Sequence, residues 1–564
     1  MKKNTIAKLI VAFNFGCALN AFGQAVPDAG SLQQQIERDR KPELPAAALP
    51  VRPAYPPVSR VQQGLTLTVK NFKFIGNTLM PEKGLASAVE SFLDRPIDFA
   101  QLQAAATATA NSYRDAGWIV RTYIPEQDFV DGSVKIQIIE AVFGKLVQEG
   151  PAPKRVLRTM IEKIIAAQQQ HGERVKSNAV DRALLLANDL PGIAVSGSLR
   201  EGANDSETDL VITATDQPLS AGDVALDNLG ARSTGARRLT ANLNVLSLFG
   251  RADLLTANAV VTEGSKYLRL GATLPLGSDG LRVGLNTSRL DYRVVLADFS
   301  DLNSHGTSGT FGVEANYPIV RQRQRNLYIN FSADQKWYDN FTGGSPSTVY
   351  ANRAISLGFS GNSFDEWRGG GALSGNLSMV AGQLDLNRSP NQAADLNTSH
   401  TAGRYSKLRY SLSRQQVLTP KLSVFASLSG QWADKNLDSS EKFSLGGSTG
   451  VRAYPSGEGS GAKAGLLTVE LQLQVPAGLQ LTGFYDVGTV TLNPENNYSG
   501  ASALNKYSLA GAGLSLALQL KQGISIKSTW ARRIGSNPNP TPTGNDQDGS
   551  LTKNRFWLSA TLSF

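Results

Sequence analysis

From residue 219 to residue 564 the sequence is almost free of helical periodicity, and segment after segment alternates apolar with polar side chains. In one of these segments Leu422, Val424, Ala426 and Leu428 occupy every second position. A period of two is typical of a strand with one apolar and one polar face. Beyond the N-terminus no apolar run is long enough to cross a membrane as a helix, whereas a membrane strand needs an apolar side chain only at every second position. This stretch therefore predicts a membrane β-barrel.

The length of the alternating stretch bounds the number of strands. At about 20–22 residues for each strand and its share of loop, residues 218–564 accommodate about sixteen antiparallel strands, an even number as in bacterial barrels. A soluble sandwich or a β-solenoid would also alternate, but a solenoid repeats over a shorter period and a sandwich of this length would divide into sections. The chain ends with an alternating strand in which Phe556, Leu558, Leu562 and Phe564 share one face, as expected for a lipid-facing strand that closes a barrel.

The N-terminus has the features of a secretory signal peptide over residues 1–23. Two lysines precede an apolar run, and Ala21-Phe22-Gly23 has the small-x-small pattern of a cleavage site. A lipoprotein signal at Cys17 is the alternative, but Asn14 stands where such signals have an aliphatic residue. We therefore expect the chain to be exported.

Export limits the chemistry that the chain can perform. Cys17 is the single cysteine and lies in the segment expected to be removed, so the exported chain would hold neither a disulfide nor a cysteine-bound metal. His171, His305 and His400 are far apart in sequence, which favours neither a zinc site nor histidine-based catalysis. We expect no catalytic residues, no metal, no cofactor and no enzymatic activity.

The formal net charge of +9 has a similarly limited meaning. The basic residues are scattered along the chain, and an exported protein meets no genome, so we expect no nucleic-acid partner. The charge indicates a solvated surface with a modest preference for acidic partners or lipid head groups.

Before the barrel the chain divides into a helix, a linker and two small units. Residues 24–41 include a short helical patch that Asp28 or Ser31 can cap, with one apolar pair, Leu32 and Ile36, four residues apart. Such a helix is polar nearly all round, so we expect it to dock in a wet environment. Residues 42–63 are rich in proline and predict an extended, semi-rigid linker.

Residues 64–143 predict a compact α+β unit with the order β-α-α-β-β. We expect its elements at residues 65–75, 82–93, 99–116, 119–125 and 134–140.

Residues 144–217 repeat this pattern. Helices are expected at residues 154–169 and 177–190, followed by strands at 193–199 and 208–215. A tandem repeat of one small unit indicates a modular arm. Taken without the rest of the chain, the two units would fit a soluble two-domain binding protein equally well.

Within the barrel region one loop stands out. Gly446-Gly447-Ser448-Thr449-Gly450-Val451-Arg452-Ala453-Tyr454 precedes two alternating strands, residues 467–475 and 479–490, joined by Pro476-Ala477-Gly478. Asp486 lies on the mostly polar face of the second strand. A loop that carries an arginine thus precedes a hairpin that carries a carboxylate, which suggests a polar interior with something folded into it.

Several motifs match one known family. Asp28-Ala29-Gly30-Ser31-Leu32 with Ile36-Glu37 is similar to its plug-helix signature, and Asp227-Asn228-Leu229-Gly230 is similar to the start of its barrel. The tandem units are similar to its POTRA domains, through Phe74-Ile75-Gly76-Asn77-Thr78 in the first and Leu184-Leu185-Leu186-Ala187-Asn188-Asp189-Leu190-Pro191-Gly192 in the second. The chain resembles, over nearly its whole length, the TpsB transporters of two-partner secretion, also called haemolysin secretion/activation proteins.

The most specific match is the glycine-rich loop. The family has a Val-Arg-Gly-Tyr tip in a loop folded into the barrel lumen, and a Phe-x-Asp-x-Gly motif on the inner wall. The resemblance implies a lumenal loop at residues 440–465 and a lumenal latch in which Arg452 pairs with Asp486. The six residues of this lumenal latch are Val451, Arg452, Tyr454, Phe484, Asp486 and Gly488. Ala453 departs from the family glycine, and if that position needs positive φ we expect strain of about 1 kcal/mol there.

The resemblance also implies a function. Such a protein sits in the outer membrane of a Gram-negative bacterium with its POTRA domains in the periplasm, and passes an unfolded TpsA-type exoprotein to the cell surface. Gly457-Glu458-Gly459-Ser460-Gly461 precedes a strand and does not open a helix, so it indicates a flexible loop and no nucleotide site. We expect transport without ATP, driven by folding of the exoprotein outside.

The family resemblance also suggests how the chain contacts its partners. An edge strand of the first unit is expected to pair with the exoprotein; its residues are Ile119, Val120, Arg121, Thr122, Tyr123 and Ile124. Phe564 is expected to serve as an assembly signal for the barrel-assembly machinery, with periplasmic chaperones assisting. We expect a monomer surrounded by outer-membrane lipid. The alternatives are an outer-membrane protein insertase of the same superfamily and a passive diffusion porin; the two units and the helix argue against both.

Overall fold

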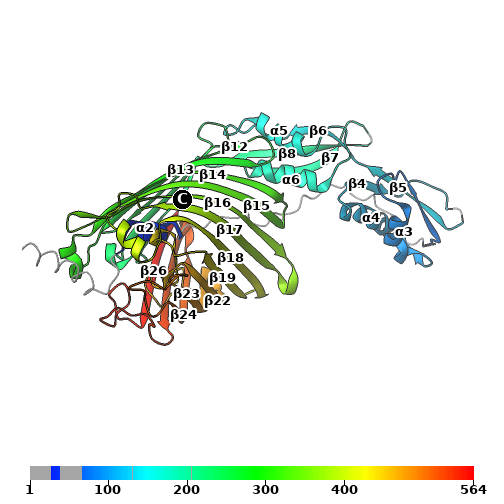
Figure 1. The fold of residues 1–564 in the computed structure, drawn as a ribbon. Coiled ribbons are helices and arrows are strands. Elements are labelled where there is room, and N and C mark those ends of the chain that lie inside the picture. Colours follow the sequence, from blue (N-terminus) through cyan, green and yellow to red (C-terminus); the bar gives the residue numbers. More distant parts are fainter. Residues whose placement is uncertain (1–26, 39–65, 130, 205) are drawn as a thin grey trace, which may run out of the picture.

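The computed structural model describes residues 27–38, 66–129, 131–204 and 206–564. The expected signal peptide and the proline-rich linker lie outside these residues. A large barrel, two small α+β units next to one end of it, and a helix that lies against the barrel strands make up the described part of the chain (Figure 1).

Sixteen strands of the described residues close into one antiparallel barrel, so the predicted fold class is confirmed. The strands are β9 (Ser220–Asp227), β10 (Arg238–Leu246), β11 (Leu254–Val261), β12 (Ser265–Leu276), β13 (Leu281–Arg293), β14 (His305–Arg321), β15 (Arg325–Thr342), β16 (Ser345–Asp365), β17 (Gly371–Asp385), β18 (Gly403–Thr419), β19 (Leu422–Ala433), β22 (Lys463–Val475), β23 (Leu479–Thr491), β24 (Lys506–Gln519), β25 (Ile524–Arg533) and β26 (Asn554–Ser563).

The first and last strands close the barrel over a short contact. Residues 559–563 of β26 pair with residues 223–227 of β9. The N–H of Phe564 donates to the carbonyl of Gly222 at 2.9 Å, and the N–H of Gly222 donates back at 3.0 Å. Phe564 is largely exposed. The last residue of the chain therefore lies at the closing seam.

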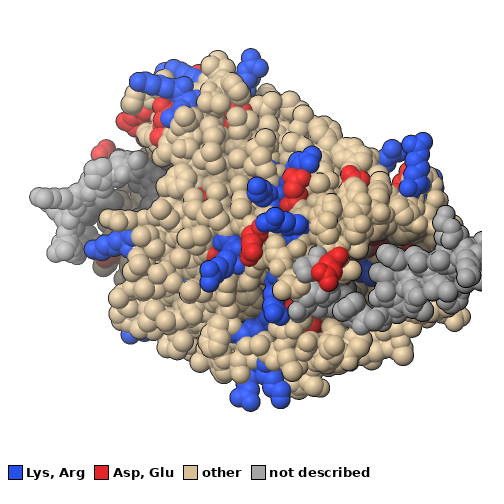
Figure 2. Space-filling view, turned by 90° about the vertical axis from the view of Figure 1, so that its left-hand side faces the viewer, with Lys and Arg blue, Asp and Glu red and all other residues tan. Residues whose placement is uncertain are grey.

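The two faces of the wall differ as the alternation predicts. On β22 the side chains of Leu467, Val469 and Leu471 are exposed on the outside, whereas Thr468 is buried on the inside. On the side of the molecule shown in Figure 2, broad areas without charge separate scattered basic and acidic side chains. The helices of the described residues include none that is long and apolar enough to cross a membrane.

The first α+β unit follows the predicted order with one difference. Its elements are β1 (Leu67–Thr68), β2 (Asn71–Ile75), α3 (Glu82–Val89), a 3₁₀ turn (Glu90–Phe92), β3 (Pro96–Ile97), α4 (Phe99–Asp115), β4 (Val120–Tyr123) and β5 (Ser133–Glu140), with a sheet ordered β2-β5-β4. The single strand expected at residues 65–75 is divided, because β1 pairs with β3 while β2 pairs with β5. Asp98 and Gln101 form a capping box that starts α4.

The second unit has the same architecture and one strand that the sequence did not reveal. It consists of β6 (Val142–Gln148), α5 (Arg158–Gln168), α6 (Ser177–Asn188), β7 (Ile193–Glu201) and β8 (Glu207–Asp216), ordered β6-β8-β7. The missed strand, β6, pairs in parallel with β8 through an irregular register between Phe143 and Leu146. That irregularity interrupts the alternation by which a strand is recognised.

Ion pairs attach the second unit to the barrel. Arg321, at the end of β14, donates to both carboxylate oxygens of Asp189 at 2.7 and 2.8 Å. Arg323, in the following turn, donates to Asp181 of α6 at 2.7 Å. A planar guanidinium held by two parallel hydrogen bonds is directional as well as charged. The unit therefore has a defined position at this end of the barrel.

A buried carboxylate in the first unit makes its stability depend on pH. Glu140 is 4% exposed and accepts hydrogen bonds from the N–H groups of Thr78 and Leu79 at 2.6 and 2.7 Å, and from the Tyr113 hydroxyl at 3.1 Å. Burial by itself raises the pKa of Glu140, but the hydrogen bonds from Thr78, Leu79 and Tyr113 outweigh burial and hold the pKa below its ordinary value.

We expect the first unit to lose stability in acid because of Glu140. Its folded pKa is lower than its unfolded pKa, so its stabilisation is complete above the unfolded value of about 4.3 and is lost as the pH falls further. Glu140→Gln should remove this pH dependence and lower the stability at neutral pH by about 1–3 kcal/mol, because the amide nitrogen cannot accept the hydrogen bond that the second carboxylate oxygen receives from the Thr78 hydroxyl. Pepsin cleavage within residues 66–141 of the full-length protein, measured against pH, checks this. Exposed Glu90→Gln is the control, and an unchanged acid profile in Glu140→Gln would contradict the assignment.

Candidate functional site

The segment between β19 and β22, residues 434–462, folds into the barrel. Two short strands within it, β20 (Phe443–Ser444) and β21 (Ser460–Gly461), pair with each other and hold its base together. At its tip the N–H of Val451 donates to the carbonyl of Leu445 at 2.7 Å. Val451, Ala453 and Tyr454 are fully buried and pack against β22, β23 and β24. The tip is thus a fixed part of the interior.

Arg452 and Asp486 form a two-pronged ion pair. The Nε and Nη2 atoms of Arg452 donate to Oδ2 and Oδ1 of Asp486, each at 2.8 Å, and the Arg452 N–H donates to Oδ2 at 3.1 Å. Asp486 on β23 is fully buried, and the Thr468 hydroxyl donates to it at 3.0 Å. Hydrogen bonds to both carboxylate oxygens in a site that excludes water make this a strong pair.

Three further contacts of Arg452 were not foreseen from the sequence. Its Nη1 donates to Glu470 on β22 at 2.8 Å. Its guanidinium lies 3.5 Å from the centre of the Phe484 ring, a cation–π contact. Its carbonyl accepts a hydrogen bond of 2.8 Å from the Trp557 indole N–H on β26. The alternation of β22 predicts that Glu470 faces the lumen. It does not predict that Glu470 pairs with Arg452.

The remaining lumenal-latch residues explain how the tip fits. A Cβ added to Gly488 would lie 2.6 Å from a methyl of Leu445, so this glycine lets the loop approach the wall closely. Tyr454 packs under the Arg533 guanidinium, which lies 4.3 Å from the centre of its ring.

The strain anticipated at Ala453 does not arise. Ala453 is not among the described non-glycine residues with positive φ. A Cβ placed on Gly511 of β24 would lie 2.6 Å from the Ala453 methyl, which shows that Gly511 leaves the space this methyl occupies.

A second buried charge holds the loop to other strands of the wall. The carboxylate of Glu441, 4% exposed, accepts hydrogen bonds from the fully buried Lys407 Nζ and from Asn352 Nδ2, the latter at 2.7 Å, and lies 3.6 Å from Lys336 Nζ. The Glu441 carbonyl accepts from Lys407 Nζ at 2.9 Å and from Gln431 at 3.0 Å. We call Glu441 with these four partners the Glu441 anchor.

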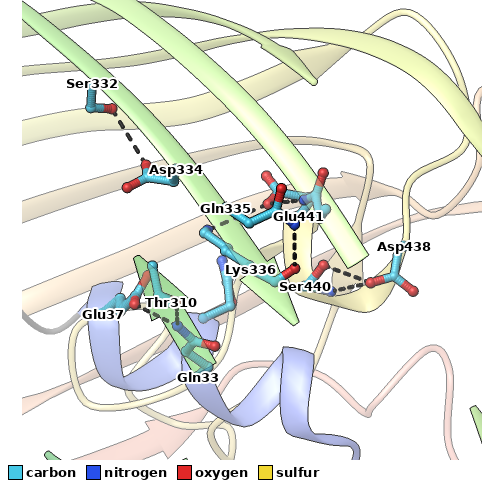
Figure 3. Close-up of polar contacts among 12 residues, drawn as sticks. Gln33, Glu37, Thr310, Ser332, Asp334, Gln335, Lys336, Asp438, Ser440 and Glu441 are labelled. Carbon is cyan, nitrogen blue, oxygen red and sulfur yellow. Dashed lines mark hydrogen bonds and ion pairs between the residues drawn. The ribbon is translucent and has the colours of Figure 1, made fainter. Parts of the chain in front are cut away.

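Helix α2 (Ala29–Arg38) lies between this loop and the wall. Asp28 caps it, since Oδ1 accepts from the Ser31 N–H at 2.7 Å. The Ala29 N–H donates to Asn340 on β15 at 2.8 Å, and Gln33 donates to Thr310 on β14 at 2.7 Å. Figure 3 shows Gln33 and Glu37 of α2 beside Lys336 on β15, with Glu441 on the other side of Lys336. The wet environment expected for this helix is the barrel interior.

Comparison with known proteins identifies the family. A model of the haemolysin secretion/activation proteins ShlB/FhaC/HecB matches residues 206–518, and a model of the ShlB-type POTRA domain matches residues 67–141. The chain belongs to this family. It is therefore a TpsB-type transporter of two-partner secretion in the bacterial outer membrane, with its POTRA domains on the periplasmic side and an exoprotein as its partner.

Individual relatives agree with this assignment. The heme/hemopexin transporter protein HuxB of Haemophilus influenzae is 24% identical over 95% of both chains, and the outer membrane transporter CdiB of Dickeya dadantii is 24% identical over 73% of both. Among solved structures, CdiB from Escherichia coli matches with a TM-score of 0.68 and 17% identity over 96% of this chain and 100% of its own. BamA from Haemophilus ducreyi, lacking POTRA domains 1–3, matches with a TM-score of 0.53 and 14% identity, covering 88% of this chain and 100% of its own. HuxB and the Dickeya dadantii CdiB are transporters by name, and the two solved structures show the same fold.

The structure divides the predicted edge strand of the first POTRA domain into three parts. Val120 to Tyr123 form β4 at an edge of the sheet. The N–H of Ile119 instead donates to the Val175 carbonyl of the second POTRA domain at 3.1 Å, and Arg121 pairs with Glu201. Ile124 packs against the first core. This stretch therefore both presents an edge and joins the two domains.

The described ranges contain no group of three or more His, Cys, Asp or Glu side chains arranged to hold a metal ion. Several charged residues of the lumen pair with one another. Arg452 with Asp486 and Glu470, and Glu441 with two lysines, carry opposite charges at contact distance, an arrangement that holds a loop in place.

Proposed function

We propose that this transporter recognises one unfolded exoprotein with its POTRA domains, residues 64–143 and 144–217, and passes it through the barrel of residues 218–564 without ATP. Residues 24–41 act as a plug and the lumenal latch keeps the loop inside the barrel. The two-pronged pair between Arg452 and Asp486 carries the proposal, because it joins the loop to the wall where a translocating chain would pass.

The lumen supports passage of an unfolded chain. A cavity of about 780 Å³ lies at the periplasmic end and is lined by Asp189, Arg282, Glu314 and Arg409 together with asparagine and serine side chains. Such a surface offers hydrogen bonds to an extended peptide without holding it in one register. Folding of the exoprotein outside the cell would then supply the driving force.

Recognition at β4 follows from its backbone pattern. The Ala141 N–H donates to the Ile119 carbonyl, and hydrogen-bonded pairs alternate in an antiparallel ladder. The pairs of Arg121 with Ile139 and Tyr123 with Gln137 are then the bonded ones, so Val120 and Thr122 direct their N–H and C=O groups outward. In the described part of the chain no strand pairs with this side of β4. An extended segment of the exoprotein can add there as a further strand.

Replacing Thr122 tests this edge. Thr122→Pro removes the outward N–H, while Thr122→Val keeps it; both lose the 2.7 Å bond from the hydroxyl to the Ala106 carbonyl. We expect Thr122→Pro to reduce exoprotein release several-fold and Thr122→Val to leave it near the parent level. Exoprotein in the culture medium, quantified by mass spectrometry, is the measurement. Equal release by the two variants would contradict pairing at β4.

The partner itself can be found by the same measurement. Deleting this gene should remove one large protein from the medium and leave the rest of the secreted proteins unchanged. A change in many outer-membrane proteins without loss of a secreted one would instead favour the alternative, an outer-membrane protein insertase.

We also propose how the barrel is assembled. Phe564, at the seam between β26 and β9, is proposed as the assembly signal read by the barrel-assembly machinery, with periplasmic chaperones delivering a monomeric chain.

A further inference from the structure

The plug helix rests on a short segment of the lumenal loop, residues 439–446. The Ser439 hydroxyl donates to Asp28 at 2.6 Å. Gln34 donates to the Lys442 carbonyl at 2.7 Å, and Arg38 donates to the Ser444 carbonyl at 2.6 Å. We call residues 439–446 the helix seat. Its position decides whether α2 keeps these three contacts.

Close packing adds to the hydrogen bonds at the seat. A Cβ added to Gly30 would lie 2.8 Å from the Ser440 Cβ and 2.6 Å from the Tyr350 hydroxyl. Gly30 therefore allows the helix to lie directly on the seat and on β16. A seat that moved by the size of one methyl group would lose this fit.

The Glu441 anchor holds the seat in place. Its four partners come from four wall strands, Lys336 on β15, Asn352 on β16, Lys407 on β18 and Gln431 on β19. Both the carboxylate and the backbone carbonyl of Glu441 are engaged. Removing the carboxylate would leave the fully buried Lys407 ammonium without its counter-charge, a state that a low-dielectric interior does not tolerate without rearrangement.

The anchor is separate from the lumenal latch. Arg452 is tied to β22 and β23 and to Trp557 on β26, whereas Glu441 is tied to β15, β16, β18 and β19. The loop is therefore attached to the wall at two separate buried points, and the seat includes the Glu441 point.

We propose that Glu441 is a positioning residue that keeps the plug helix in the lumen, and that it does so independently of Arg452. The proposal rests on the proposed role of α2 as the plug. Thiol labelling and conductance are measured without an exoprotein. The proposal for Glu441 can therefore fail while the proposed secretion function stands, and the secretion function can fail while the proposal for Glu441 stands.

The test places a single thiol on the helix. Ala29 is fully buried against the wall, and the only cysteine of the sequence, Cys17, is expected to leave with the signal peptide. In an Ala29→Cys background, the purified full-length protein in detergent is treated with a bulky maleimide, and its ion conductance is measured in planar lipid bilayers. Glu441→Gln keeps the shape and an acceptor oxygen but removes the charge.

We expect Glu441→Gln to accelerate labelling of the introduced thiol several-fold and to raise the average conductance. Glu366→Gln is the control: it removes an exposed carboxylate from the turn between β16 and β17, away from the seat. Lys407→Met is a second test variant. It leaves the contacts of Asn352 and Lys336 with Glu441 in place, so it should raise the labelling rate and the conductance by less than Glu441→Gln. Should Glu441→Gln not fold, as judged by heat-modifiable migration on gels, Lys407→Met carries the test.

Two results would overturn the proposal. Labelling and conductance of the folded Glu441 and Lys407 variants at the parent level would show that the anchor does not retain the helix. Labelling in Arg452→Ala as fast as in Glu441→Gln would show that the two attachment points are not independent.

Discussion

Replacing Arg452 by alanine is expected to lower exoprotein release by more than about tenfold while the barrel still inserts, because breaking a buried ion pair costs about 3–5 kcal/mol and leaves the remaining charges uncompensated. Asp486 is fully buried and the Glu470 side chain is 15% exposed, and both lose their cation. The loop tip also loses its cation–π contact with Phe484. The measurement is exoprotein in the medium, normalised to folded transporter in the outer membrane.

Two controls make this result specific. Arg289→Ala breaks an exposed pair with Asp291, where the side chains are 69% and 49% exposed, and should leave release unchanged. Arg452→Lys keeps the charge but not the two-pronged geometry, so it should restore release only in part. Normal release by Arg452→Ala would show that the lumenal latch does not hold the loop in its working position.

Removing the plug, residues 24–41, is expected to raise the conductance of the purified protein in planar bilayers several-fold. The helix fills the lumen between the loop and strands β13, β14 and β15, and its buried residues Ala29 and Leu32 pack against lumenal tyrosines such as Tyr338 and Tyr350. Its departure would replace packed side chains with water along the path of ions. An unchanged conductance would show that the plug does not limit the pore.

Substitutions within the helix refine this prediction. Gly30→Val would place side-chain atoms where Tyr350 and Ser440 already lie, so it should push the helix from its seat and raise the conductance in part. Gln35→Val introduces the same side chain at a partly buried position of the same helix, away from the Tyr350 and Ser440 contacts, and is the matched control. The two variants share the cost of a β-branched residue in a helix, so a difference between them reports the contact with the wall.

Local sequence patterns determined the architecture. The period of two over residues 219–564 predicts which side chains face lipid and which face the lumen, because successive side chains of a strand point to opposite faces whatever its neighbours are. This is how Thr468, Glu470 and Asp486 could be placed on one polar face before any contact was known. The helices of both POTRA domains were also predicted from their own periodicity, whereas the irregular β6 was missed.

Contacts between distant residues needed the closed barrel. The Arg452–Asp486 pair came from the family resemblance, and no spacing along the chain would have revealed the Glu441 anchor, whose partners lie on four different strands. Such sites depend on which strands face one another across the lumen and on how deep the loop enters, and neither is encoded in a local period. The sequence by itself thus determined that these strands form a barrel wall and which of their side chains face the lumen. It also showed the glycine-rich loop before β22. Only the tertiary structure decided that this loop is held at two buried charges and carries a helix between them, because a buried charge is stable only where folding brings its counter-charge within contact.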